Sequence, residues 1–167
     1  MNELPTISQK QRQRWLEIFA LGLFLIGNVL SILSLAAEIL GLDLTPGFGI
    51  VQMIQLLLGI TFLTFAGFLH VASLRPAGTP RSLQADIGIR FAATGLVFAY
   101  VSGLSDLIGI GTHIEPNFER PYVGPLQLGG IVLGIIAITT GLLLYYTSRG
   151  TRETSSLEFL LHHDKTN

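Results

Sequence analysis

The sequence contains no cysteine and few charged residues. Without cysteine, the chain forms no disulfide, no thiolate metal site and no thiol nucleophile. Only 13% of the residues are charged, against about 25% in a typical soluble domain, and the net charge of −1 argues against binding to nucleic acid. The chain also lacks phosphate-binding loops, nucleophile elbows, HExxH sequences and dinucleotide fingerprints. We therefore predict no catalytic residue, no cofactor and no metal ligand.

The chain is rich in long apolar segments. Hydrophobic residues make up 49% of it, and the mean hydropathy is +0.57. Residues 18–37, 44–74 and 121–148 contain no Asp, Glu, Lys or Arg, and roughly 20 apolar residues suffice to cross the hydrocarbon core of a bilayer. A fourth segment reaches that length if it runs from Phe91 to Gly111. The sequence therefore predicts an all-α membrane protein, a bundle of four transmembrane helices at about 15–40, 48–73, 85–111 and 122–147.

Basic residues are concentrated on one side of this predicted bundle. The N-terminal segment, the loop around residues 75–81 and the C-terminal tail carry most of them, whereas the two opposite loops carry only Arg120. By the positive-inside rule, we expect both termini in the cytoplasm and the protein in the plasma (cell inner) membrane. Residues 1–14 and 148–167 are then cytoplasmic segments, and residues 15–147 form the membrane domain. A basic start also suits a secretory signal, but the apolar run is longer than a signal core.

The two halves of the chain resemble each other. EILGL at residues 38–42 parallels DLIGI at 106–110, and PGFGIVQ at 46–52 parallels PYVGPLQ at 121–127. A Gly-Ile pair follows each glutamine at the same distance, at 59–60 and 134–135. This pattern predicts two tandem helical hairpins that enter the membrane from the same side, related by a pseudo-twofold axis along the membrane normal.

Rows of small residues indicate where the helices pack. At 100° per residue, the small side chains fall on one face of each of three predicted helices. Such rows let helix backbones approach closely within a membrane. The predicted packing residues are Gly27, Ser31, Ser34, Gly95, Ala99, Ser102, Gly103, Gly130, Gly134, Ala137 and Gly141.

Polar side chains near the outer surface form the candidate functional cluster. Glu38 and Asp106 extend two of the small-residue rows, so we expect both carboxylates to face protein and not lipid. The whole cluster comprises Glu38, Gln52, Gln55, Asp106, His113, Glu115 and Gln127. At the inner interface, the i,i+4 spacing of Asp86 and Arg90 predicts an ion pair.

Three functions are compatible with this pattern. Small loops and packing rows favour a non-catalytic membrane subunit that packs with other membrane proteins, or with a second copy of itself, and stabilises or orients them. A second hypothesis is the transport of an ion, a proton or a small solute by Glu38 and Asp106. A third is a membrane enzyme that handles a lipid or quinone, with Asp106, His113 and Glu115 transferring protons.

Overall fold

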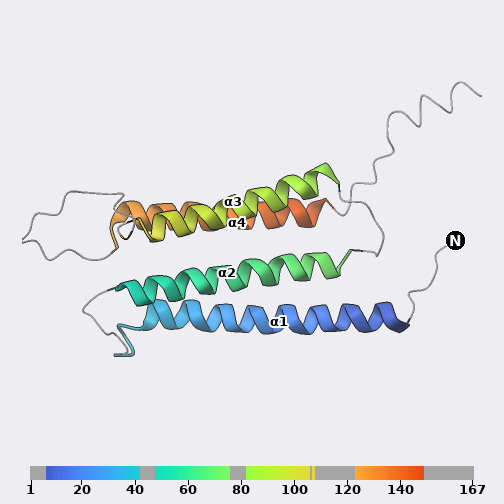
Figure 1. The fold of residues 1–167 in the computed structure, drawn as a ribbon, viewed down its shortest axis with the longest axis horizontal. Coiled ribbons are helices and arrows are strands. Elements are labelled where there is room, and N and C mark those ends of the chain that lie inside the picture. The colour runs from blue at the N-terminus through green and yellow to red at the C-terminus, as the bar shows by residue number, and fades with distance from the viewer. Residues whose placement is uncertain (1–6, 42–47, 76–81, 106, 108–122, 149–167) are drawn as a thin grey trace, which may run out of the picture.

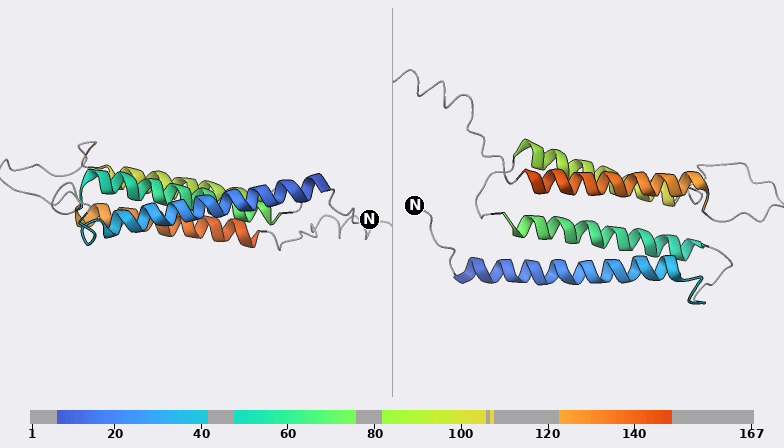
Figure 2. Two further views of the ribbon diagram at one scale, coloured as in Figure 1. Left: turned by 90° about the horizontal axis from the view of Figure 1, so that it is seen from below. Right: turned by 180° about the vertical axis from the view of Figure 1, so that it is seen from behind.

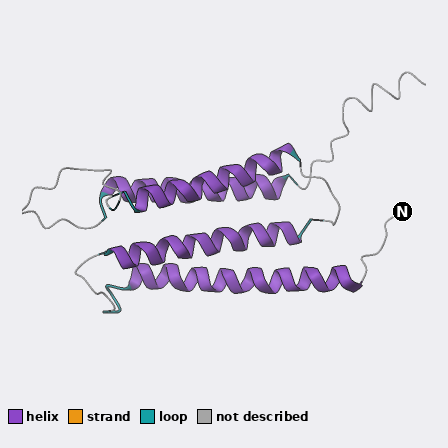
Figure 3. Cartoon of the chain, in the orientation of Figure 1, coloured by secondary structure: helices purple, strands orange, loops and turns teal. Residues whose placement is uncertain are grey.

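A computed structural model describes residues 7–41, 48–75, 82–105, 107 and 123–148 of the chain, with side chains from residue 11 onward. The described part contains α1 (Ile7–Ala36), α2 (Ile50–Ser73), α3 (Leu83–Gly103) and α4 (Pro125–Thr147) (Figure 3). All four helices are long and apolar enough to cross a membrane. In lipid a helix satisfies its own backbone hydrogen bonds, which is why apolar runs of this length adopt it. The prediction of an all-α, multi-pass membrane protein with four spanning helices is confirmed.

The four helices lie along one common long axis and run alternately up and down the bundle (Figure 1). α1 packs along α2, and α3 packs along α4, so the chain forms a first and a second helical hairpin (Figures 1 and 2). The two hairpins meet through α2, which contacts both α3 and α4; among the described residues α1 contacts α2 alone. We call the end where α1 begins and α4 ends the proximal end, and the opposite end the distal end.

α1 differs from its predicted range at both ends. It begins at Ile7, within the basic N-terminal segment, and ends at Ala36 instead of continuing to residue 40. The chain turns directly after Ala36, where the Leu40 N–H donates to the Ala36 carbonyl (2.9 Å) and the Gly41 N–H to the Glu38 carbonyl (3.3 Å). Gly41, at the end of this turn, has a φ of +64°, a conformation that glycine adopts without steric cost.

α3 lies earlier in the sequence than predicted. It begins at Leu83, where the Ser82 hydroxyl accepts a hydrogen bond from the Ala85 N–H (3.2 Å) and caps the first turn. It ends at Gly103, well short of the predicted residue 111, and the turn that follows contains Leu104 and Ser105. α3 thus reaches spanning length by including the charged residues at its proximal end.

The largest apolar core lies between α2 and the second hairpin. Met53 and Leu57 are almost completely buried there, at 0% and 1% exposure. The cluster consists of Met53, Leu56, Leu57, Ile60, Ala99, Ile131 and Ile138. A second, smaller cluster of Val71, Ala85 and Tyr145 lies toward the proximal end. These two clusters, with the polar contacts described below, hold the hairpins together.

Candidate functional site

Small residues bring the backbones of α1 and α2 into direct contact. A Cβ atom placed on Gly27 would lie 2.9 Å from the Gly59 carbonyl oxygen and 3.0 Å from the Leu63 nitrogen. A Cβ on Gly59 would lie 3.0 Å from the Gly27 carbonyl oxygen and would also meet the Ser31 hydroxyl. Real Cβ atoms keep larger distances, so only glycine fits at either position.

The second hairpin packs in the same way. A Cβ atom on Gly95 would lie 2.8 Å from both the Gly134 carbonyl oxygen and the Ile138 nitrogen, and a Cβ on Gly134 would lie 2.8 Å from the Gly95 carbonyl oxygen. About two helical turns nearer the proximal end, a Cβ on Gly141 would lie 2.5 Å from both the Gly88 carbonyl oxygen and the Ala92 nitrogen. α3 and α4 therefore touch backbone to backbone along most of their length.

The remaining predicted packing residues also lie at helix contacts, with one change of partner. Ala99 is fully buried against Gly134, Ala137 lies against Gly95, and the Ser102 hydroxyl lies beside Gly130. In the first hairpin, the Ser34 hydroxyl donates to the Gln52 carbonyl across to α2 (2.6 Å). Gly103 faces the other hairpin: a Cβ there would lie 3.0 Å from the Met53 sulfur on α2.

Two glutamines of the predicted cluster act as helix caps. Each is the third residue of its helix, Gln52 in α2 and Gln127 in α4, and each is buried. The Gln52 side-chain oxygen accepts the Gly49 N–H (2.5 Å), and that of Gln127 accepts the Gly124 N–H (2.8 Å). This is the side-chain half of a capping box, which satisfies an N–H group that the helix leaves unpaired.

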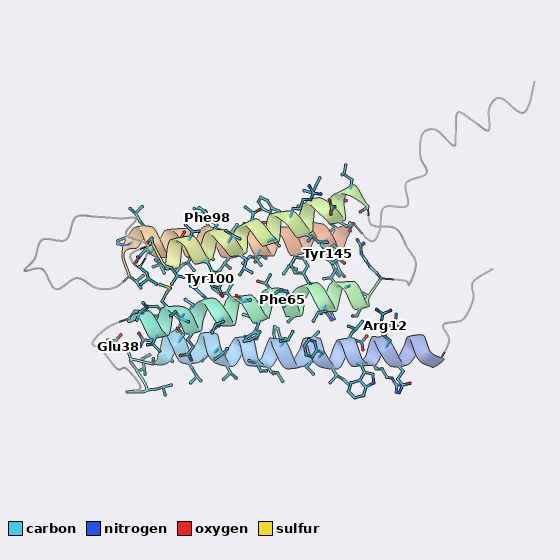
Figure 4. The ribbon with its side chains drawn as sticks, viewed as in Figure 1. Arg12, Glu38, Phe65, Phe98, Tyr100 and Tyr145 are labelled. Atoms are coloured by element: carbon cyan, nitrogen blue, oxygen red, sulfur yellow. The ribbon has the colours of Figure 1, made fainter. Side chains whose placement is uncertain are left out.

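The structure does not bring the predicted cluster together within the described residues. Gln127 reaches one polar neighbour, the Ser105 hydroxyl (2.9 Å), and Gln55 is half-buried on α2. Glu38 is exposed in the turn after α1, because the helix ends two residues before it, and so it does not face a neighbouring helix as expected (Figure 4). Asp106, His113 and Glu115 lie outside the described residues. In the described ranges, no group of three His, Asp or Glu residues is positioned to hold a metal ion.

Asp86 and Arg90 form an ion pair on the surface of α3. Their side chains approach to 2.9 Å and are 42% and 79% exposed, respectively. An exposed i,i+4 pair of this kind contributes little to stability. The pair holds no tertiary contact between the hairpins.

An arginine that the sequence did not single out joins the hairpins at the proximal end. The Arg75 guanidinium, just after α2, lies 4.5 Å from the centre of the Tyr145 ring on α4 and donates to the Ser148 hydroxyl (2.6 Å). Tyr145 also packs edge-on against Phe68 of α2, with ring centres 5.9 Å apart. The cation lies where α2 and α4 both end, and helix C-termini favour positive charge. We call Arg75, Tyr145 and Ser148 the proximal clasp.

A second polar contact joins the hairpins near the middle of the bundle. The Thr61 hydroxyl on α2 donates to the Leu57 carbonyl (2.8 Å), so it accepts from the Tyr100 hydroxyl on α3 at 2.9 Å. Figure 4 shows Tyr100 and Tyr145 on the side of the second hairpin that faces α2. Tyr100 thereby places its ring in the apolar core while its hydroxyl remains hydrogen-bonded.

A seven-residue repeat in the sequence could have identified Ser148 of the proximal clasp. Small or polar residues recur at seven-residue intervals on α2 and α4 and all are buried: Gln52, Gly59, Ala66, Ser73 and Gln127, Gly134, Gly141, Ser148. A seven-residue interval keeps side chains on one seam of a packed helix pair. The predicted repeat included the glutamines and the first glycines but not the serines, and so it stopped short of the proximal end.

Comparison with protein-family models, with curated proteins and with solved structures finds no match to this chain.

Proposed function

We propose that the protein is a small non-catalytic membrane subunit that packs with other membrane proteins and stabilises or orients them. The observation that carries this proposal is the position of α1, which packs against α2 alone in the described part of the chain. The side of α1 away from α2 carries large apolar side chains that are 56–64% exposed: Ile18, Leu21, Leu25, Ile32 and Leu35. Lipid tails are as apolar as these side chains, so close packing and hydrogen bonding, and not apolarity, would select a helix of another protein over lipid on this surface.

The use of buried polar groups supports a non-catalytic role. Gln52 and Gln127 cap helices, Ser34 ties α1 to α2, and Tyr100 ties α3 to α2. Polar side chains at these positions stabilise the bundle. The transport hypothesis requires Glu38 to face another helix, and its exposed position offers no support for that. The enzyme hypothesis depends on residues outside the described part.

We also propose that the two hairpins arose by tandem duplication. Aligning Gly27 with Gly95 and Gly59 with Gly134 superimposes the backbone contact of the first hairpin on that of the second. The same alignment matches the glutamine caps of α2 and α4. The equivalence of the two hairpins covers the contacts within each of them. Between the hairpins, α3 contacts α2, whereas α1 contacts neither α3 nor α4 among the described residues. This departs from the expected pseudo-twofold arrangement.

For orientation, we propose that the proximal end faces the cytoplasm of a plasma (cell inner) membrane. The described arginines, among them Arg12, Arg75 and Arg90, belong to the proximal parts of their helices, whereas the charged residue described at the distal end is Glu38 (Figure 4). This distribution agrees with the positive-inside rule. Labelling of single cysteines at Glu38 and at Thr147 with an impermeant maleimide tests it: in intact cells, only the Glu38 position should react.

Isolation from native membranes tests the subunit proposal. We expect the affinity-tagged protein, solubilised in a mild detergent, to retain one or more other membrane proteins in constant ratio. Deleting the gene should then lower the amount of those partners, because an unpaired membrane subunit is degraded. A protein that migrates free of other membrane proteins, with its neighbours unchanged by the deletion, would contradict the proposal.

A further inference from the structure

We infer that two copies of the protein associate through one face of α1, with Asn28 of each copy at the contact. Asn28 lies within the spanning segment Gln11–Ala36, roughly 7 Å from its midpoint at 1.5 Å per residue. That depth is well inside a hydrocarbon layer about 30 Å thick. One N–H of the Asn28 amide donates to the Phe24 carbonyl in the preceding turn (2.9 Å). Its carbonyl oxygen and its second N–H contact no hydrogen-bonding group among the described residues, and lipid offers none.

Asn28 belongs to a regular apolar row on α1. It is flanked by Leu21, Leu25, Ile32 and Leu35, at alternating intervals of four and three residues. These are the intervals of an a/d row in a two-stranded coiled coil, with Asn28 at a d position. Within a membrane, an asparagine side chain on such a row hydrogen-bonds across to the neighbouring helix. The four flanking side chains are 56–64% exposed, because the row points away from the face of Gly27 that packs on α2. A second helix would cover this row without disturbing the first hairpin.

The second hairpin already uses the matching surface to bind a helix. With Gly27 aligned to Gly95, Ile32 corresponds to Tyr100 and Leu35 to Gly103. Tyr100 and Gly103 are the residues through which α3 meets α2. The correspondence between α1 and α3 rests on the proposed duplication, whereas the depth of Asn28 and the spacing of its apolar row do not.

The chemistry of the asparagine selects a second copy as the occupant. A primary amide is both donor and acceptor, so two asparagines that meet across a twofold axis satisfy each other. Copies inserted in the same orientation are related by an axis along the membrane normal, which makes the two α1 helices parallel and places Asn28 opposite Asn28. The inference assigns to a second copy the same α1 face that supports the proposed packing with other membrane proteins, so its test has to distinguish the two occupants.

Single-cysteine cross-linking tests the contact on the full-length protein, because the natural chain has no cysteine. Leu25→Cys and Ile26→Cys are matched in depth and in exposure, 56% and 51%, but lie on different faces of α1. In isolated membranes treated with copper phenanthroline, we expect a covalent dimer from Leu25→Cys and little or none from Ile26→Cys. Adding Asn28→Leu should weaken association roughly 3- to 30-fold, the effect of one hydrogen bond between membrane helices.

Thr94→Val supplies the control for Asn28→Leu. Thr94 is also exposed within a spanning helix and also donates to the carbonyl one turn earlier, at Arg90 (2.9 Å), but it lies on α3. Its substitution should leave the Leu25→Cys dimer unchanged. Equal cross-linking at Leu25→Cys and Ile26→Cys, or a dimer indifferent to Asn28→Leu, would overturn the inference. Cross-links from Leu25→Cys to another protein, without a dimer, would also overturn the inference but would leave the subunit proposal intact. A dimer in a protein that retains no other partner would support the inference and contradict the subunit proposal.

Discussion

The backbone contact between α3 and α4 makes a sharp prediction for Gly134→Ala. In a helix interior, alanine is more favourable than glycine by about 1 kcal/mol. At Gly134 the added methyl group would lie 2.8 Å from both the Ala99 Cβ and the Gly95 carbonyl oxygen. Optimal separations between carbon atoms are about 3.5–4.0 Å, so the helices must separate locally by roughly 0.7–1.2 Å. Overpacking of this kind costs about 1–3 kcal/mol.

Gly129→Ala is the matched control on the same helix, because a Cβ at Gly129 meets nothing within 4 Å. Both variants gain the same helix propensity, so the difference in their free energies of unfolding isolates the packing cost. We expect Gly134→Ala to be less stable than Gly129→Ala by about 1–3 kcal/mol, measured by reversible SDS titration in mixed micelles and followed by far-UV circular dichroism. Equal stability of the two variants would refute the direct backbone contact.

Three further outcomes are expected from the same titration. Tyr100→Phe should lower the free energy of unfolding by about 0.5–1.5 kcal/mol. Introduced into a Thr61→Val protein, it should cause no additional loss of stability; an equal loss in both backgrounds would rule out the hydrogen bond between Tyr100 and Thr61. Arg75→Gln should lower the free energy of unfolding by roughly 1–2 kcal/mol because the stacking on Tyr145 is lost. Tyr145→Leu should then destabilise the Arg75→Gln protein less than it destabilises the natural protein; equal losses in the two backgrounds would argue against the proximal clasp. Glu38→Gln should leave stability unchanged, since the side chain is exposed beyond the end of α1, and a clear loss would show that the carboxylate has a structural partner.

Much of the helical architecture follows from the sequence alone. An apolar segment in lipid has to satisfy its own backbone, so length and hydropathy suffice to predict four helices. Glycine and alanine at helical spacing identify the faces that pack, since only small side chains allow close approach. The paired glutamines at Gln52 and Gln127 occupy equivalent caps because the same local sequence precedes each helix.

Helix ends were harder to predict, because they depend on single residues and not on composition. Ser82 begins α3 earlier than hydropathy indicates, and the left-handed conformation of Gly41 follows an early end to α1. The consequence is largest for Glu38: a helix continuing to residue 40 would place it on a packing face, whereas the observed turn exposes it.

Only the tertiary structure decided which faces meet. Gly103 shares its row with residues that pack on α4, yet it faces Met53 of α2. The bond between Tyr100 and Thr61 and the contact of Arg75 with Ser148 join residues far apart in the chain. Periodicity assigns a side chain to a face of its own helix, but its partner depends on how the helices cross. By itself the sequence determined the helices and their small-residue faces; the meeting of the two hairpins through α2, which leaves α1 open on one side, was decided by packing.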